Sequence, residues 1–207
     1  MKRYAFFLLV LLATVSCSNS GTPSESASQA VEDIIMSRRS VRKYLDRTVS
    51  REILDEILYA GINAPNGQNR QAYEVRVVDD RDFLEAVSSA VLSEGSEVAT
   101  PRSATGGLFF NAPCVVFIAN DTSYDMSQVD CGLLGENLIL SAWSRGIGSC
   151  CLAGPVRQMK ASEACAPLIR QMGFSEGYNL LYCISLGYPD ESPAAKPRKT
   201  EKIRYVE

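Results

Sequence analysis

The chain has 207 residues, of which 46% are hydrophobic and 22% charged, and a formal net charge of −3. This composition supplies a buried core for one domain of ordinary size. Histidine is absent, which excludes a Ser-His-Asp triad, a histidine general base and a histidine-ligated metal. The seven cysteines show no CxxC spacing, and the adjacent pair Cys150-Cys151 is poorly suited to a shared zinc, so we expect no metal site.

The first residues have the pattern of an export signal. Lys2 and Arg3 precede an apolar run over 4–13, which is too short to span a membrane as a stable helix. Because Cys17 follows closely, the segment resembles a bacterial lipoprotein signal peptide. This predicts a signal peptide over 1–16, cleavage before Cys17 and a lipid on its thiol. The alternative is an ordinary signal peptide with an unrelated cysteine.

Residues 17–29 carry the anchor cysteine and then small polar residues that cannot bury enough surface to fold, so we expect a flexible tether. The lipid is the only membrane contact that we expect. These segments together predict a protein of the bacterial cell envelope, lipid-anchored and facing away from the cytoplasm. Under the alternative interpretation it is secreted or periplasmic.

Residues 30–207 show no internal repeat or second linker and are interpreted as one domain. Ser50 is the expected N-cap of a helix with one apolar face, which must end before Pro65. A capping box formed by Ser127 and Asp130 is expected to start a long helix that ends near Gly146. Further helices are expected over 31–35, 83–91, 155–165 and 167–173, strands over 73–78, 114–119, 147–152 and 178–189, and a mobile loop over 93–107.

Helices and strands alternate without strict βαβ regularity, so the predicted fold class is α+β. The final residues, KIRYVE, have the composition of an additional edge strand. The long helix is apolar on more than one face, and Gly132 and Gly135 would let another backbone approach it. A buried helix or a dimer interface explains this pattern.

Positive residues form two clusters in an otherwise acidic chain. Six lie between Arg38 and Arg51, and five lie between Lys196 and Arg204. Either cluster alone is explained by a solvated face without a partner. If the fold brings the two together, they need an anion between them, and a phosphate fits because arginine binds its oxygens bidentately. No aromatic residues interleave with an extended basic stripe, so we expect no nucleic-acid partner.

Six stretches of the chain form a pattern when they are taken together. They are RRSVRKY (38–44), APNGQNRQAYE (64–74), NAPCVVFIAN (111–120), DCGLLGENLILSAWSRGIGSC (130–150), LGYP (186–189) and KPR (196–198). In this order and at these separations, the chain from residue 31 to its end resembles the FMN-dependent nitroreductase superfamily. The resemblance implies a mixed central sheet flanked by helices and an intertwined homodimer with FMN at the interface.

The resemblance also implies cofactor contacts at matching positions. The phosphate and ribityl chain of FMN would be held by Arg38, Arg39, Ser40 and Arg42, and by the C-terminal pair Lys196 and Arg198. A loop from the partner subunit would pack on the flavin ring through Pro65, Asn66, Gly67, Asn69 and Gln71. The turn that would lie against the ring near N5 consists of Cys151, Leu152, Ala153 and Gly154.

The sequence departs from the family pattern at places that leave the substrate open. Asn66-Gly67 stands where small hydroxyl residues are common, and Ala153 stands where some members have Glu. Cys150-Cys151 could be a redox pair, but small apolar packing is the simpler interpretation because adjacent cysteines bond only with backbone strain. Cys114 and Cys183 lie in apolar strands and are expected in the core.

The function that this resemblance implies is FMN-dependent oxidation and reduction, in which the flavin carries the chemistry and no side chain is catalytic. Hydride would pass from a reduced donor, expected to be NAD(P)H, to a nitroaromatic, quinone or similar planar acceptor in a ping-pong cycle. Arg42 is the candidate for the positive charge that stabilises the reduced flavin. An envelope location would separate the protein from cytoplasmic NAD(P)H. Alternatives are therefore a tethered flavin-binding protein without turnover and a sibling chemistry such as dehalogenation or flavin breakdown.

Overall fold

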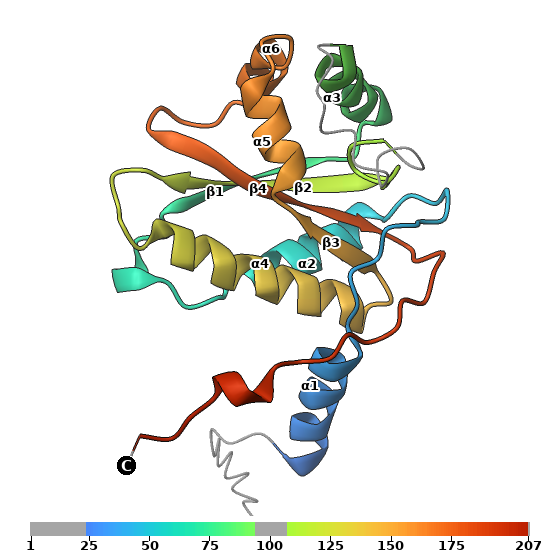
Figure 1. The fold of residues 1–207 in the computed structure, drawn as a ribbon, viewed down its shortest axis with the longest axis vertical. Helices are drawn as coiled ribbons and strands as arrows, with labels where there is room; N and C mark the ends of the chain where they lie inside the picture. The colour runs from blue at the N-terminus through green and yellow to red at the C-terminus, as the bar shows by residue number, and fades with distance from the viewer. Residues whose placement is uncertain (1–23, 94–106, 207) are drawn as a thin grey trace, which may run out of the picture.

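The computed structural model describes residues 24–93 and 107–206 (Figure 1). The expected signal peptide, Cys17 and most of the expected loop over 93–107 lie outside these residues. The elements are, in chain order, α1 (Glu25–Ser37), α2 (Arg51–Ile62), η1 (Gly67–Asn69), β1 (Tyr73–Val78), α3 (Arg81–Ser93), β2 (Cys114–Asp121), α4 (Ser127–Ser144), β3 (Gly148–Leu152), α5 (Gly154–Ala161), α6 (Ala166–Gln171), β4 (Tyr178–Gly187) and η3 (Thr200–Lys202).

The strands form one sheet in the order β1-β2-β4-β3, and each pair of neighbours is antiparallel. A parallel contact is added only by the isolated bridge between Ser40 and Ser149, so the expected mixed sheet is, within the described residues, antiparallel apart from this bridge. Helices α2 and α4 cover one face of the sheet, and α3, α5 and α6 cover the other (Figure 1). The predicted α+β class is confirmed.

The core lies on both faces of the central strand β2. Its residues from Cys114 to Ala119 are all buried, as its unbroken apolar run predicts. On the α4 face, Leu134 and Leu138 pack against the sheet and against α2. Gly61 allows this approach, because a Cβ there would lie 2.6 Å from Leu138 Cδ2. Truncation of a buried leucine such as Leu138 to alanine costs about 2–5 kcal/mol.

Local signals placed several boundaries correctly. Ser50 caps α2 by accepting a hydrogen bond from the Ile53 backbone N–H at 3.4 Å, and α2 ends before Pro65. The expected capping box at α4 is wrong: Met126 is the N-cap and makes no side-chain cap bond. The Asp130 carboxylate instead accepts a hydrogen bond from a backbone N–H far away in the sequence, and that contact belongs to the site described below.

The expected helix over 155–165 is shorter than predicted. Helix α5 ends at Ala161, because Ser162 leaves the helical region and its hydroxyl accepts a hydrogen bond from the Cys165 backbone N–H at 3.2 Å. The C-terminal segment forms η3 and no strand up to residue 206. Its Ile203, Tyr205 and Val206 side chains are exposed.

Helix α1 begins at Glu25, inside the segment that was expected to be a flexible tether, because the Ser24 hydroxyl caps it through the Ala27 backbone N–H. None of its residues is buried. It is held at its C-terminal end, where the Trp143 indole N–H donates a 2.9 Å hydrogen bond to the Ser37 hydroxyl. Within the described ranges, no helix is both long enough and apolar enough to cross a membrane.

Candidate functional site

The two basic clusters meet at one cleft of about 410 Å³, which we call the basic cleft. Its N-terminal side comes from the end of α1 and the segment after it, its C-terminal side from the segment after β4, and α4 contributes one carboxylate. The residues that line it are Ile35, Met36, Arg38, Arg39, Ser40, Arg42, Glu136, Pro193, Ala194, Ala195, Lys196 and Arg198. The fold therefore brings together six of the residues proposed to hold the phosphate and ribityl chain.

Backbone hydrogen bonds explain why the arginines of this segment face the cleft. Val41 is fully buried, and its N–H donates to the Ser149 carbonyl of β3 at 2.9 Å. Gly148 makes room for it, since a Cβ there would lie 2.9 Å from Val41 Cγ2. The Arg42 N–H donates to the Glu191 carboxylate. With Val41 turned inward, its neighbours Ser40 and Arg42 remain on the cleft side.

The cations of the basic cleft keep their charge available. Among the described residues, none of them forms a salt bridge with a carboxylate; the four salt bridges lie elsewhere, for example between Arg145 and Glu56. Their side chains bond instead to backbone carbonyl oxygens, as Arg39 does to Met36 and Arg198 does to Lys196. Glu136 is the single acidic residue of the lining. The cleft therefore carries a surplus of positive charge that suits an anion.

The stretch 64–72, which we call the amide loop, has an unusual backbone. Gln68, Asn69 and Gln71 have φ values of 56°, 54° and 50°. These values lie in the left-handed region of the backbone, which residues other than glycine rarely adopt. Its buried ends, Ala64 and Ala72, fix it to the body of the protein. Its conformation presents amide side chains outward, because the described side chains of residues 68, 69 and 71 are exposed.

Three contacts hold the amide loop in this shape. Asn66 Oδ1 accepts a hydrogen bond from the Gln71 N–H at 2.9 Å, and Asp130 Oδ1 accepts one from the Gly67 N–H at 3.0 Å. The Tyr124 hydroxyl lies where a side chain at residue 67 would be, only 1.9 Å from the position of a Cβ. A side chain at residue 67 would therefore displace the Tyr124 hydroxyl, which accounts for a glycine where small hydroxyl residues are common.

The turn from β3 into α5 contains Cys151, Leu152, Ala153 and Gly154. Leu152 is buried, whereas the Cys151 side chain is exposed. Partial burial is the largest cause that raises the pKa of the Cys151 thiol, and the neighbouring Cys150 and Glu136 raise it further. The thiol therefore stays protonated at neutral pH. None of the four residues of this turn lines the basic cleft, but Glu136, which does, is close enough to Cys151 to affect the pKa of its thiol.

The remaining cysteine expectations are confirmed. Cys150 points to the opposite side of β3 from Cys151 and packs in the core. Cys114 and Cys183 are buried in the central strands, and burial raises the thiol pKa of both. The packing interpretation therefore holds for Cys150, whereas the Cys151 side chain is exposed and does not pack in the core.

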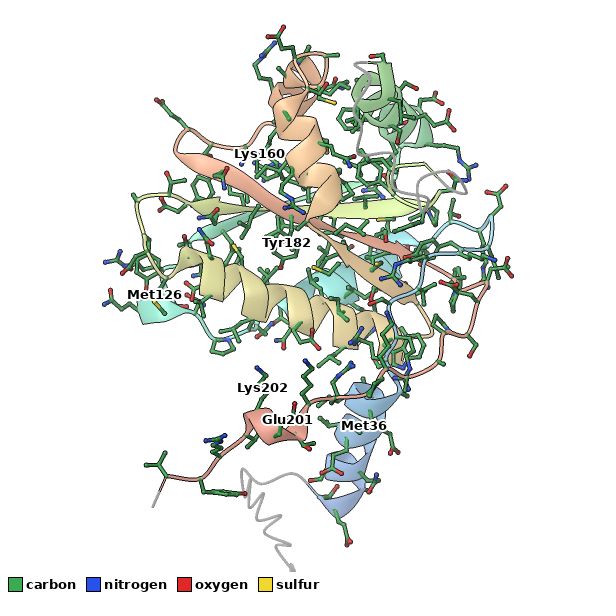
Figure 2. The ribbon with its side chains drawn as sticks, viewed as in Figure 1. Met36, Met126, Lys160, Tyr182, Glu201 and Lys202 are labelled. Carbon is green, nitrogen blue, oxygen red and sulfur yellow. The ribbon has the colours of Figure 1, made fainter. Side chains whose placement is uncertain are left out.

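The amide loop does not line the basic cleft of its own chain. It lies at the first turn of α4, where Asp130 binds it, whereas α1 joins the last turn of α4 through Trp143. These positions are thirteen residues apart on one helix, which is roughly 20 Å at 1.5 Å per residue. Figure 2 shows the same separation: Met126 lies at one end of α4, and Met36 lies on α1 near the other end.

Four contact residues were missed by the sequence analysis. Asp130 and Glu136 lie within a quoted motif, but Asp130 was interpreted as a helix cap and Glu136 received no role. Tyr124 and Glu191 have no local signal, because their partners Gly67 and Arg42 lie far away in the sequence. A deviation from the family pattern, glycine at residue 67, was the one available hint for Tyr124.

Comparison with known proteins identifies the family. The family model described as "Nitroreductase family" matches residues 35–188. This chain belongs to the nitroreductase family. The match includes the N-terminal arginines of the basic cleft, the amide loop and the β3–α5 turn, and it ends before Lys196 and Arg198.

Individual relatives agree with this nitroreductase assignment. An Archaeoglobus fulgidus protein named as an NADH dehydrogenase/NAD(P)H nitroreductase is 32% identical over 163 residues, covering 76% of this chain and 84% of that protein. The NADPH-flavin oxidoreductase of Vibrio harveyi is 28% identical over 178 residues, covering 80% of this chain and 68% of its own length. The crystal structure of a Desulfitobacterium hafniense nitroreductase with bound FMN superposes with a TM-score of 0.77 at 29% identity, covering 86% of this chain and 98% of that one.

Proposed function

We propose that this nitroreductase is an FMN-dependent oxidoreductase, in which bound FMN takes hydride at N5 from NAD(P)H and passes it to a planar acceptor such as a nitroaromatic or a quinone. Family membership and the FMN bound in the solved relative support a flavin oxidoreductase. The observation in this chain that carries the proposal is the basic cleft, in which cations from the two ends of the domain meet and, among the described residues, form no salt bridge with a carboxylate.

The basic cleft fits the phosphate end of FMN. A phosphate monoester carries a charge of about −1.5 to −2 at pH 7. Arg38, Arg39, Arg42, Lys196 and Arg198 supply donors from two sides, and arginine can bind phosphate oxygens bidentately. Hydrogen bonds to a charged group contribute about 1.5–3 kcal/mol each, and partial exposure of the cleft reduces this. Arg42 is our candidate for the charge that favours the reduced, anionic cofactor.

The ring end of the site is proposed to need a second copy of the chain. The amide loop supplies uncharged donors and acceptors suited to a neutral ring, but it does not line the basic cleft of its own chain. Its contact on α4, Asp130, is roughly 9 Å along the helix from Glu136 in the cleft lining. Exposed apolar side chains surround α4 and mark a face for another copy. They are Met126, Val129 and Leu133 on α4, Tyr59 and Ile62 on α2, Val31, Ile35 and Met36 on α1, and Ile203, Tyr205 and Val206 in the C-terminal segment.

In such a homodimer, the two regions of different copies would meet on one cofactor. The basic cleft and the β3–α5 turn would come from one copy, and Pro65, Asn66, Gly67, Asn69 and Gln71 from the other. The Cys151 thiol is neutral and adds no charge beside the ring. No side chain needs to act as a general base, which is compatible with a chain that lacks histidine.

Anchoring by lipid at Cys17 is likewise proposed, on the pattern of residues 1–17 alone. It would hold the domain on the outer side of a bacterial membrane through a short tether that ends at α1. Mass spectrometry of the mature N-terminus from membranes tests it: a diacylglyceryl cysteine as first residue is expected, and an unmodified Cys17 overturns it. An envelope location favours one alternative function, a tethered flavin-binding protein that NAD(P)H does not reduce.

The absorption spectrum of the purified domain, with a donor titration, tests the proposed function. A dimer in sedimentation with one FMN per chain is expected, with flavin absorption that bleaches on addition of NADH or NADPH and returns on addition of a nitroaromatic or a quinone. Bound flavin that neither nicotinamide reduces would instead support the flavin-binding alternative. A colourless protein that takes up no added FMN would contradict both.

A further inference from the structure

We propose that Asp130 and Tyr124 clamp Gly67 and thereby fix the amide loop in the one backbone shape that receives the flavin ring, so that Asp130 is a positioning residue for the cofactor. This inference rests on the proposed function, since it assumes that the loop contacts the ring. It concerns residues outside the basic cleft. The phosphate end of the site can therefore remain intact while the clamp is altered.

The backbone of the amide loop is strained at three residues, and this strain needs restraint. Gln68, Asn69 and Gln71 all have φ between 50° and 56°, a region that each would leave in an unrestrained chain. Such backbone persists only where the surroundings over-determine it, and it concentrates at ligand sites. Within the loop, the Asn66 side chain restrains one end through the Gln71 N–H. The Arg70 N–H also donates to the Gly67 carbonyl at 3.0 Å within the loop, and further restraint comes from outside it.

That outside restraint is a buried carboxylate. Asp130 is 3% exposed, and its Oδ1 accepts the Gly67 N–H at 3.0 Å. Its Oδ2 is buried and has no hydrogen-bond partner among the described residues. A buried carboxylate with so few partners is costly, although the first turn of α4, where it lies, favours negative charge. Within the part of the chain that the structure describes, its one side-chain hydrogen bond is with the amide loop, and this is the role that the structure assigns to it.

The second half of the clamp is steric. The Tyr124 hydroxyl occupies the space over Gly67 that any Cβ would need. The Arg70 guanidinium lies 4.5 Å from the centroid of the Tyr124 ring, so the loop contacts this ring from two positions. The turn that carries Tyr124 is itself fixed, because the Ser127 hydroxyl lies 2.6 Å from the Tyr124 carbonyl oxygen. Gly67 is thus held between a carboxylate and a phenol on fixed backbone.

Because the clamp acts on the loop at the ring end of the site, its loss should not discriminate between a flavin with a phosphate and one without. Asp130→Ala should weaken binding of FMN and of riboflavin by the same factor, about tenfold, as expected for the loss of one hydrogen bond to a charged group. Asp130→Asn keeps an acceptor oxygen and should recover part of the loss. Asp125→Asn, an exposed carboxylate in the neighbouring turn, is the matched control and should bind both flavins as wild type does.

A second pair of variants tests the steric half without touching Asp130. Gly67→Ala places a Cβ against the Tyr124 hydroxyl and should weaken both flavins by about tenfold or more. In Gly67→Ala/Tyr124→Phe the hydroxyl is gone, and the nearest ring carbon lies at 3.0 Å, so most of the binding should return. Amide hydrogen exchange on the full chain without flavin gives an independent readout, in which the Gly67 N–H is slow in wild type and fast in Asp130→Ala.

The outcomes separate this inference from the proposed function. If wild type takes up neither flavin, the proposed function fails and the inference fails with it. If wild type binds both flavins and Asp130→Ala and Gly67→Ala bind them equally well, the clamp alone is wrong. If Asp130→Ala does not fold, the recovery of Gly67→Ala by Tyr124→Phe still decides: recovery supports the clamp, and its absence overturns it.

Discussion

The basic cleft and the amide loop are built by opposite physical means. The cleft consists of long charged side chains from two ends of the chain, half-buried or exposed, with backbone carbonyls as their main partners. The loop has, apart from Arg70, uncharged side chains on a backbone that three contacts restrain. Charge is concentrated in the first region, and conformational restraint in the second.

This difference matches what each end of a flavin nucleotide would require. A phosphate is recognised by charge, which acts over several ångströms and tolerates flexible side chains. A flat neutral ring offers few charges, so its recognition depends on donors and acceptors that are already in place before binding. Variants of the two regions should therefore fail in different ways, and the following predictions separate them.

The largest effect is expected in the basic cleft. Arg38→Ala/Arg198→Ala removes a cation from each side of the cleft and should weaken FMN binding by about a hundredfold or more, since each charge-assisted bond contributes about 1.5–3 kcal/mol before screening. Riboflavin lacks the phosphate, so its binding should change little. Calorimetric titration of the apoprotein with both flavins measures the difference.

Arg145→Ala provides the control for this variant. Arg145 pairs with Glu56 outside the cleft, so its substitution removes one positive charge, against two in the double variant, without touching the phosphate site. The control should bind FMN as wild type does at matched ionic strength. An equal loss for FMN and riboflavin in Arg38→Ala/Arg198→Ala would show that these arginines act on the ring or on folding, and the contrast between the two regions would be lost.

An intermediate effect is expected at a second glycine that faces a tyrosine. A Cβ on Gly135 would lie 2.0 Å from the Tyr182 hydroxyl, which donates to the Cys131 carbonyl at 2.5 Å between α4 and β4 (Figure 2). Gly135→Ala should therefore lower the free energy of unfolding by about 1–3 kcal/mol, measured in urea. In Gly67→Ala the added Cβ also meets a tyrosine hydroxyl, but in a surface loop. This variant should therefore change the free energy of unfolding less than Gly135→Ala does, and flavin binding more.

Gly132→Ala on the same helix is the matched control, because no atom lies within 4 Å of the added Cβ. In the isolated chain, Gly132→Ala should raise the free energy of unfolding by about 0.5–1 kcal/mol, because alanine has a higher helix propensity than glycine. Tyr182→Phe in the Gly135→Ala background should restore part of the lost stability. If Gly135→Ala unfolds at the same urea concentration as wild type, the packing of Tyr182 against α4 is not as tight as the distances indicate.

Sequence reasoning succeeded where the physics is local. The Ser50 cap, the end of α2 before Pro65 and the apolar strand β2 each depend on residues that are close along the chain. It failed at Asp130, where a carboxylate three residues after a serine has the spacing of a capping box. Its true partner, Gly67, is 63 residues away, and no local pattern shows that contact.

In the candidate site, too, the features that depend on local sequence were predicted, and those that depend on distant contacts were not. Charge counting alone found both basic clusters, but their meeting depends on tertiary contacts such as the bond from the Val41 N–H to Ser149. The resemblance to nitroreductases supplied the pairing of the two ends. It did not supply Glu136, which lines the cleft from α4, or Tyr124, whose hydroxyl occupies the space that a side chain at residue 67 would need.

The smallest effect is expected at the turn that carries Tyr124. The Ser123 hydroxyl and N–H both donate to Asp121 Oδ1, at 2.7 and 2.8 Å, and these bonds hold the pKa of the Asp121 carboxyl below its usual range. A carboxyl whose pKa is lower in the folded state stabilises that state above the unfolded pKa of about 3.9 and loses this effect as the pH falls. Asp121→Asn should thus lower the urea midpoint slightly at pH 7, and the difference from wild type should shrink towards pH 3.

Ser123→Ala tests whether these bonds are the cause. It removes the hydroxyl donor but leaves the Ser123 backbone N–H, so it should reproduce part of the pH-dependent difference, and adding it to Asp121→Asn should change little further. Because the Asp121 N–H also donates to the carbonyl of Ala72, where the amide loop ends, a loosened turn would reach the loop. A constant difference between Asp121→Asn and wild type from pH 7 to pH 3 would mean that Asp121 acts through packing, and the turn would then restrain the amide loop by shape alone.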